Sequence, residues 1–454
     1  MLLHRRTRAA LTAAAISLTA AEAAAQEILS PEVAALIEAQ AAKIRDLEAR
    51  LARLEARSDS AAPGVSVAPE PASPVAEAPV QLATRSAATP AAMAAASAPK
   101  PSGLTPPTLR GRAQFDALVY NNDEGSQSTG TEVRRFRLGA KGQLSEHLSY
   151  VAEADFGGGE VSLQDVMLSY ELAEGRVLSG GYFRPPITMD ELTSSNETVF
   201  LERSAYASTF GPGRRVGVAA SAWGEQWGLS GGLFGETEDS DLDTEREEAW
   251  LVAGRGYVDL LSGEPALHLG LSAYHTQLPD RSPGVRLRAR PETGRAPRLV
   301  DTGAFIAEEG TFVGVEFGYG AGPLTVQAEG GGIDYAGAIS GPDFSGWSAQ
   351  AAWRWTGETR PYDIESGVFG RIRPARPLGQ GGLGALETGL RVTHLDLGDE
   401  TVDGGQMTTY GVVVNWLPIT KLRLSANLIQ ARIERLRANP VDESLLTLRT
   451  AVDW

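Results

Sequence analysis

The sequence contains no cysteine, which excludes a disulfide framework and any metal site built from thiolates. No apolar run beyond the N-terminal region reaches the roughly 20 residues of a membrane-spanning helix. The net charge of −16 argues against nucleic acid as a partner. The five histidines lack metal-ligand spacing, so the sequence predicts neither a metal site nor a cofactor.

Lysine is scarce and occurs only as Lys43, Lys100, Lys141 and Lys421. Arginine therefore supplies nearly all of the positive charge. Its guanidinium group stays charged and binds carboxylates and phosphates through two parallel hydrogen bonds. The positions of the arginines are thus the most informative charge signal in this acidic chain.

Residues 1–25 have the features of a secretory signal peptide. A basic head around Arg5 and Arg6 precedes an apolar stretch, and the alanines at 23–25 fit a cleavage site before Gln26. A membrane anchor is the alternative, but the apolar stretch is too short to span a bilayer. We therefore predict that the mature protein is exported.

Residues 26–57 have helical periodicity. Apolar residues recur at spacings of four and three, with Gln40 in the same seam, as in a coiled coil. A helix this short needs partners to be stable in water, so we expect a periplasmic coiled coil that helps to set the oligomeric state. A single amphipathic helix on the membrane surface is the alternative. Residues 58–108, rich in Ala, Pro and Ser, read as an extended linker.

From residue 109 to the C-terminus, polar and apolar residues alternate with a period of two between Gly, Asn, Asp and Pro turns. Phe136 and Leu138, for example, alternate with Arg135 and Arg137. This alternation predicts many antiparallel strands. Composition alone also fits a soluble β-sandwich or a solenoid. The strands, however, run to about ten residues, as a tilted membrane strand requires, and this length favours an all-β transmembrane barrel.

We expect about sixteen strands in residues 109–454, because bacterial barrels have an even strand number. Aromatic residues near the predicted strand ends resemble the girdles at membrane interfaces: Tyr120, Tyr170, Tyr182, Trp353, Trp355, Trp416 and Trp454. If the N-terminus lies in the periplasm, the outer loops are residues 122–130, 157–160, 184–213, 236–245, 276–310, 336–343, 396–404 and 434–442.

Three ordered runs carry a family resemblance: FRPPITMDELTSSN from residue 183, FLERS from residue 200, and FGPGRRVG from residue 210. They resemble the phosphate- and polyphosphate-selective porins of Gram-negative outer membranes. Residues 288–303 (RARPETGRAPRLVDTG) and 356–391 are similar to the same family. The resemblance implies a homotrimer whose third outer loop and whose turn at 356–391 enter the barrel and narrow it. It also implies lysine clusters at the channel mouths, which this chain lacks.

The candidate pore-lining residues are all arginines, because they fall in the family-like stretches or on the polar face of predicted strands: Arg135, Arg137, Arg184, Arg203, Arg214, Arg288, Arg290, Arg354, Arg371, Arg373 and Arg391. A column of arginines can pass an anion between several weak sites. The alternative is that each arginine pairs with a carboxylate, such as Glu153, Asp155, Glu387 or Asp453, and only fills the wall.

These features predict an outer-membrane porin for passive diffusion of small hydrophilic solutes, with small anions such as phosphate favoured. Because lysine clusters are absent, a general anion pore or a mixed pore stays open. The second candidate is a barrel that tethers the outer membrane to the cell wall through residues 26–57, with possible peptidoglycan contact. No catalytic constellation supports an enzyme, since Glu308 and Glu309 fit a solvated loop-to-strand transition.

Overall fold

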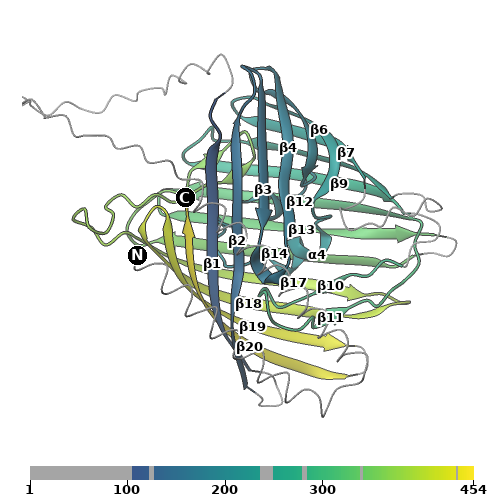
Figure 1. Ribbon diagram of the computed structural model, residues 1–454. Coiled ribbons are helices and arrows are strands. Elements are labelled where there is room, and N and C mark those ends of the chain that lie inside the picture. Colours follow the sequence, from purple (N-terminus) through teal and green to yellow (C-terminus); the bar gives the residue numbers. More distant parts are fainter. Residues whose placement is uncertain (1–104, 122–126, 236–248, 279–283, 338–340, 436–437) are drawn as a thin grey trace, which may run out of the picture. The chain divides into compact units, whose positions relative to one another are not determined.

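The computed structural model describes residues 105–121, 127–235, 249–278, 284–337, 341–435 and 438–454. Within these residues, sixteen antiparallel strands form one closed barrel (Figure 1). In order around the barrel they are β1 (Thr108–Asn121), β2 (Gln127–Gln143), β3 (Leu148–Asp155), β4 (Ser162–Ala173), β5 (Arg176–Phe183), β6 (Arg215–Trp223), β7 (Trp227–Phe234), β8 (Trp250–Asp259), β9 (Ala266–Gln277), β12 (Glu309–Ala321), β13 (Leu324–Ala336), β14 (Asp343–Arg354), β17 (Ala385–Gly398), β18 (Asp403–Ile419), β19 (Leu422–Arg435) and β20 (Ala438–Asp453).

Strand β1 closes the barrel, because it pairs with β2 on one side and with β20 on the other. The pairing with β20 runs from Arg112 opposite Asp453 to Asn121 opposite Ser444. A closed barrel leaves no sheet edge, so the backbone hydrogen bonds that a bilayer demands are made between strands. The predicted antiparallel barrel of about sixteen strands is therefore confirmed.

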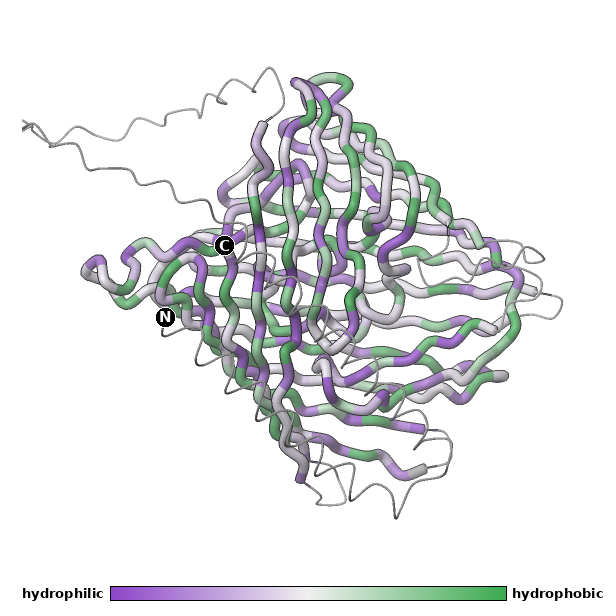
Figure 2. The backbone as a smooth tube through the Cα atoms, in the orientation of Figure 1, coloured by the Kyte–Doolittle hydropathy of each residue, from purple (hydrophilic) through white to green (hydrophobic). Residues whose placement is uncertain are grey.

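The alternation of the sequence places apolar side chains on the outside of the barrel. In β12, Val313, Val315 and Phe317 are exposed on the outer face, whereas Phe312 and Glu316, at the alternate positions, are buried in the interior. Figure 2 shows the same alternation of hydrophobic and hydrophilic residues along most strands. This pattern is that of a wall between lipid and a filled lumen.

The two ends of the barrel differ. The loop end, where β1 ends and β2 begins, carries most of the long connections, and the turn end carries the short turns. A single-turn 3-10 helix, η1 (Gly157–Gly159), lies in the second loop. Tyr120 differs from the prediction: it packs beside buried Leu118 and its hydroxyl donates to Glu443, so it faces the interior and not a lipid girdle.

The third loop (residues 184–214, hereafter loop 3) folds into the barrel, as the family resemblance implies. Its two short helices are α3 (Met189–Leu192) and α4 (Ala205–Phe210). Figure 1 places α4 inside the ring of strands. Tyr206 and Phe210 of α4 are at most 1% exposed, and Phe210 packs against Phe312 of the wall with ring centroids 6.0 Å apart. Part of the lumen is thus filled by apolar packing.

Two further connections reach the interior. The fifth loop (residues 278–308, hereafter loop 5) contains the hairpin β10 (Arg288–Ala289) and β11 (Val300–Asp301). The long turn at residues 355–384 (hereafter the inward turn) contains β15 (Tyr362–Asp363) and β16 (Val368–Phe369). Phe369 is 2% exposed and belongs to a buried cluster with Met189 of loop 3. The implied entry of this turn into the barrel is therefore observed.

Residues 1–104 lie outside the described residues, and with them the predicted signal peptide, coiled coil and nearly all of the linker. Among the described residues, the helices are too short and insufficiently apolar to cross a membrane.

Candidate pore constriction

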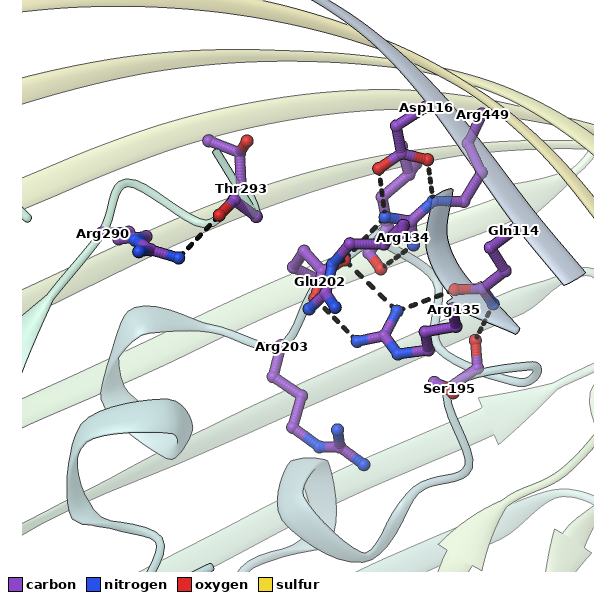
Figure 3. A network of polar contacts seen from close by, with 12 residues as sticks. Gln114, Asp116, Arg134, Arg135, Ser195, Glu202, Arg203, Arg290, Thr293 and Arg449 are labelled. Carbon is purple, nitrogen blue, oxygen red and sulfur yellow. Dashed lines mark hydrogen bonds and ion pairs between the residues drawn. The ribbon is translucent and has the colours of Figure 1, made fainter. Parts of the chain in front are cut away.

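Loop 3 is anchored to the wall through the carboxylate of Glu202, which three arginines contact (Figure 3). Arg134 of β2 donates two hydrogen bonds of 2.9 and 2.7 Å. Arg135 of β2 and Arg449 of β20 each donate to the same carboxylate, at 2.9 and 2.6 Å respectively. Strands β2 and β20 flank β1, so one loop carboxylate connects both sides of the barrel seam.

The arginines around Glu202 have further partners. Arg449 makes two parallel hydrogen bonds of 2.7 and 2.6 Å to Asp116 of β1. Arg135 donates to the Gln114 side chain at 2.8 Å. Burial of Glu202 alone would raise its pKa, but Arg135, Arg134 and Arg449 outweigh this effect and hold the pKa well below its ordinary value. Glu202 is therefore an ionised anchor.

Loop 5 holds the same segment of loop 3 from another direction. The Glu292 carboxylate accepts from the backbone N–H of Ala205 at 3.0 Å, at the N-terminus of α4, and from Arg391 of β17 at 3.0 and 2.5 Å. Arg391 also donates to the Glu202 carbonyl and lies 4.2 Å above the ring of Phe200. Glu292 adopts φ of 55°, a left-handed conformation that costs a non-glycine residue free energy.

The inward turn is held by wall residues of β8. Arg255 donates to the carbonyls of Ser366 and Gly367 at 2.7 and 2.8 Å and forms an ion pair with Glu316. The Tyr257 hydroxyl lies within hydrogen-bond distance of the carbonyls of the turn. These contacts fix the turn against β8, at the edge of the cavity described below.

A second face of loop 3 carries three arginines that share two carboxylates. Arg184 lies 2.7 Å and Arg203 3.4 Å from the Glu191 carboxylate, and Arg214 contacts Asp165 of β4 at 2.9 Å. Burial lowers the pKa of Arg184 to about 9; Glu191 opposes this shift, whereas Arg203 and Arg214 add to it. Positive charge is therefore concentrated on this face of the loop.

A cavity of about 640 Å³ runs from this face of loop 3 to the turn end. Arg184 and Pro186 of loop 3 close its inner end, and Glu146 and His147 line it at the turn end. Between them the wall is formed by β3 to β8. Because loop 3 covers the arginine-rich wall opposite, this cavity marks the side of the lumen that is open to solvent.

The predicted arginines fall into two groups. Those that form ion pairs with carboxylates are Arg135, Arg137, Arg184, Arg203, Arg214, Arg354, Arg371 and Arg391. Arg288, Arg290 and Arg373 are exposed and have no carboxylate partner within the described part of the chain. All four carboxylates named as alternative partners form such ion pairs: Glu153 and Asp155 with Arg137, Glu387 with Arg354, and Asp453 with Arg371.

The sequence reasoning missed the carboxylates that organise the site. Glu191 and Glu202 lie within the family-like runs of loop 3, and Glu292 lies within that of loop 5, yet only the arginines were selected. A carboxylate inside a run rich in arginine is the signal that could have identified them. No cluster of three or more His, Asp or Glu side chains suited to a metal ion occurs among the described residues.

Comparison with solved structures places the fold among outer-membrane channels. The channel DcaP of Acinetobacter baumannii matches 78% of this chain and 98% of its own, with a TM-score of 0.50 at 9% identity. The anion-selective porin from Comamonas acidovorans matches 77% of this chain and 99% of its own, with a TM-score of 0.49 at 12% identity. At such identities only the barrel architecture is comparable.

Comparison of sequences reaches further. A protein of Caulobacter vibrioides, described as uncharacterized, is 31% identical over 444 residues, which cover 92% of this chain and 89% of the relative. The sequence profile of phosphate-selective porin O and P matches residues 108–454, the whole barrel. The chain therefore belongs to the phosphate-selective porin O and P family and is an outer-membrane porin, a channel for passive diffusion of small hydrophilic solutes.

Proposed function

We propose that this porin favours small anions and that the face of loop 3 formed by Arg184, Arg203 and Arg214 is its selectivity site. The observation that carries the proposal is the sharing of two carboxylates by three guanidinium groups on one face of loop 3, of which Arg184 lines the inner end of the cavity. An anion that passes this point finds uncompensated positive charge where water is scarce and screening is weak.

The exposed arginines of loop 5 support the same preference. Arg288, Arg290 and Arg298 are exposed. Partial burial lowers the pKa of Arg298, and the neighbouring charges of Arg288 and Arg290 lower it further. Arg373 adds an exposed guanidinium group in the inward turn. Such groups attract anions from solution, and this attraction weakens as the salt concentration rises. With so few lysines, we infer a general preference for anions and not a phosphate-specific site.

The reversal potential across a tenfold KCl gradient in planar bilayers tests the proposal. The expected sign is that of chloride selectivity. Arg184→Gln together with Arg214→Gln is expected to shift the potential towards zero or cation selectivity, and Arg290→Ala and Arg373→Ala are expected to give smaller shifts. Arg432→Gln, on the outer face of β19, is the matched control. Cation selectivity that none of these changes alters would overturn the proposal.

We also propose a homotrimer, assembled in outer-membrane lipid. Strands β3, β5 and β7 have 8 residues each and β6 has 9, whereas a tilted membrane strand needs roughly 9–11. A neighbouring copy can cover this short wall, whose outer face carries a groove lined by residues such as Leu168, Leu178 and Val218. Light scattering of the protein in detergent, corrected for bound detergent, gives the mass; a monomer would contradict this proposal.

The tethering alternative rests on residues 26–57 and on a periplasmic N-terminus with peptidoglycan contact. We propose that the N-terminus lies in the periplasm, because β1 starts at the turn end. Short turns face the periplasm in outer-membrane barrels.

A further inference from the structure

The cavity wall carries one serine from each of five neighbouring strands. Ser149, Ser169 and Ser179 lie directly opposite one another on β3, β4 and β5. Ser221 of β6 lies directly opposite Ser230 of β7. All five line the cavity. They form a belt of hydroxyl groups around the short wall, hereafter the serine belt.

The serine belt differs from the rest of the wall because its side chains are only partly buried. Elsewhere the interior guanidinium and carboxylate groups pair with one another, and hydroxyl and amide side chains such as Ser348, Thr393 and Asn415 are buried. In the belt, Ser169 and Ser179 share one hydrogen bond of 3.0 Å. Among the described residues, no side chain or carbonyl holds the hydroxyl groups of Ser221 and Ser230. Each hydroxyl can donate one hydrogen bond and accept two, so the belt offers free hydrogen-bonding capacity to a solute.

Positive charge at the inner end of the cavity sets the second requirement on a solute, because Arg184 lines it there. Arg255, opposite Ser230, is paired with Glu316, and Glu146, Glu171 and Glu365 line the cavity farther from loop 3. A solute with several hydroxyl groups and one anionic group matches both features. The volume of about 640 Å³ falls within the range of roughly 300–1,000 Å³ for sites that enclose small molecules.

We propose that the channel takes small polyhydroxylated organic anions, that is, sugar acids and phosphorylated sugars, and that the serine belt is their path. This inference rests on the proposed anion preference for its charge and on the belt for its hydroxyl specificity. Single hydroxyl contacts are weak, and a row of weak sites allows a solute to enter and to leave. The hydroxyl groups of the belt thus take the place of the water molecules around the solute one after another as the solute moves along the wall.

The first test compares gluconate with butanesulfonate, an anion without hydroxyl groups, by bi-ionic reversal potentials in planar bilayers. The full chain is expected to be more permeable to gluconate. In S179A/S221A/S230A this permeability ratio is expected to drop by about fivefold, the equivalent of one hydrogen bond, with chloride conductance retained. Ser345→Ala, on the outer face of β14, is the matched control. Glucose 6-phosphate in a parallel arm distinguishes phosphate from carboxylate as the anionic group.

A second test removes charge from the comparison. Proteoliposome swelling rates are measured with sorbitol and with triethylene glycol, and the full chain is expected to favour sorbitol more than the triple variant does. If both tests give equal ratios in the full chain and the variant, the inference is overturned. If only sorbitol shows the effect while the KCl gradient shows cation selectivity, the proposed anion preference fails and the hydroxyl specificity stands. Retained chloride conductance shows that the variant folds.

Discussion

At the scale of single residues, the central feature is that a carboxylate of loop 3 occupies a site built by wall arginines. Glu202 receives hydrogen bonds from Arg134, Arg135 and Arg449, all charge-assisted and therefore stronger than neutral ones. Removing one member of a buried ion pair is costly mainly because the other charges lose their partner. The position of loop 3 thus depends strongly on one side chain.

Glu202→Gln removes that charge with little change of shape. We expect loop 3 to lose roughly 3–5 kcal/mol of docking free energy, because three guanidinium groups are left with less compensation. Single-channel recordings should then show larger and noisier conductance than the unchanged chain. Glu197→Gln is the control, since the carboxylate of Glu197 lies 3.7 Å from Arg371 and the backbone contacts of this residue are kept. Identical traces for Glu202→Gln and the unchanged chain would mean that Glu202 does not position the loop.

The pH dependence of this anchor follows from the direction of its pKa. The folded state depresses the pKa of Glu202, so its contribution is fully present above the ordinary carboxyl pKa and is lost only as the pH falls through the depressed value. We therefore expect the same conductance and noise at pH 5 and pH 7. Current noise that increases in the unchanged chain as the pH is lowered from 7 to 5, but not in Glu202→Gln, would contradict the assignment of Glu202 as an ionised anchor.

At the scale of elements, loop 5 and loop 3 form one assembly. Glu292 of loop 5 joins the N-terminus of α4 to Arg391 of the wall. Glu292 is 4% exposed, so its two contacts are shielded from water. The constriction is therefore set by two loops that are distant in sequence, and loop 5 acts as a clamp.

Glu292→Gln tests the clamp. The amide keeps an acceptor for Ala205 but turns a donor towards Arg391, so we expect a loss of about 2–5 kcal/mol and frequent transitions between conductance levels. Asp301→Asn, which affects the partly exposed pair with Arg286, is the matched control and should change little. Equal behaviour of the two variants in single-channel recordings would show that loop 5 does not hold loop 3.

Strands and loops differed in how far the sequence could predict them. Period-two alternation, as in Phe136 to Leu138 beside Arg135 and Arg137, locates a strand and its inner face from neighbours alone. The partner of each arginine could not be predicted in this way. Arg449 and Glu202 are 247 positions apart and meet only because β20 closes onto β1 and loop 3 crosses the lumen. Such pairings depend on the path of a loop without regular periodicity.

At the scale of the whole molecule, the barrel and the N-terminal region are predicted to have separate roles. Deletion of residues 27–104, with the signal peptide kept, removes none of the strands of the closed barrel. We expect the conductance of this variant to match that of the full chain. If the tethering alternative holds, the variant loses its attachment to the cell wall, which is measured by sedimentation with peptidoglycan. A variant that inserts normally but conducts nothing would show that the N-terminal region is part of the pore.

At the scale of the whole molecule, the proposed solute route runs between loop 3 and the serine belt, with positive charge at its narrow end. Because the chain has no cysteine, single cysteines can mark this route. Ser221→Cys places a thiol in the cavity, whereas Gln114→Cys places one beneath loop 3, where the native side chain is 0% exposed. Both variants leave the arginines of the constriction in place.

The most direct measurement is the rate at which charged thiosulfonate reagents, added on the side of the loop end, modify these thiols and reduce conductance. We predict that conductance through Ser221→Cys is blocked, faster by an anionic than by a cationic reagent, and that conductance through Gln114→Cys is not. Block of Gln114→Cys alone, or faster reaction of Ser221→Cys with the cationic reagent, would contradict this prediction.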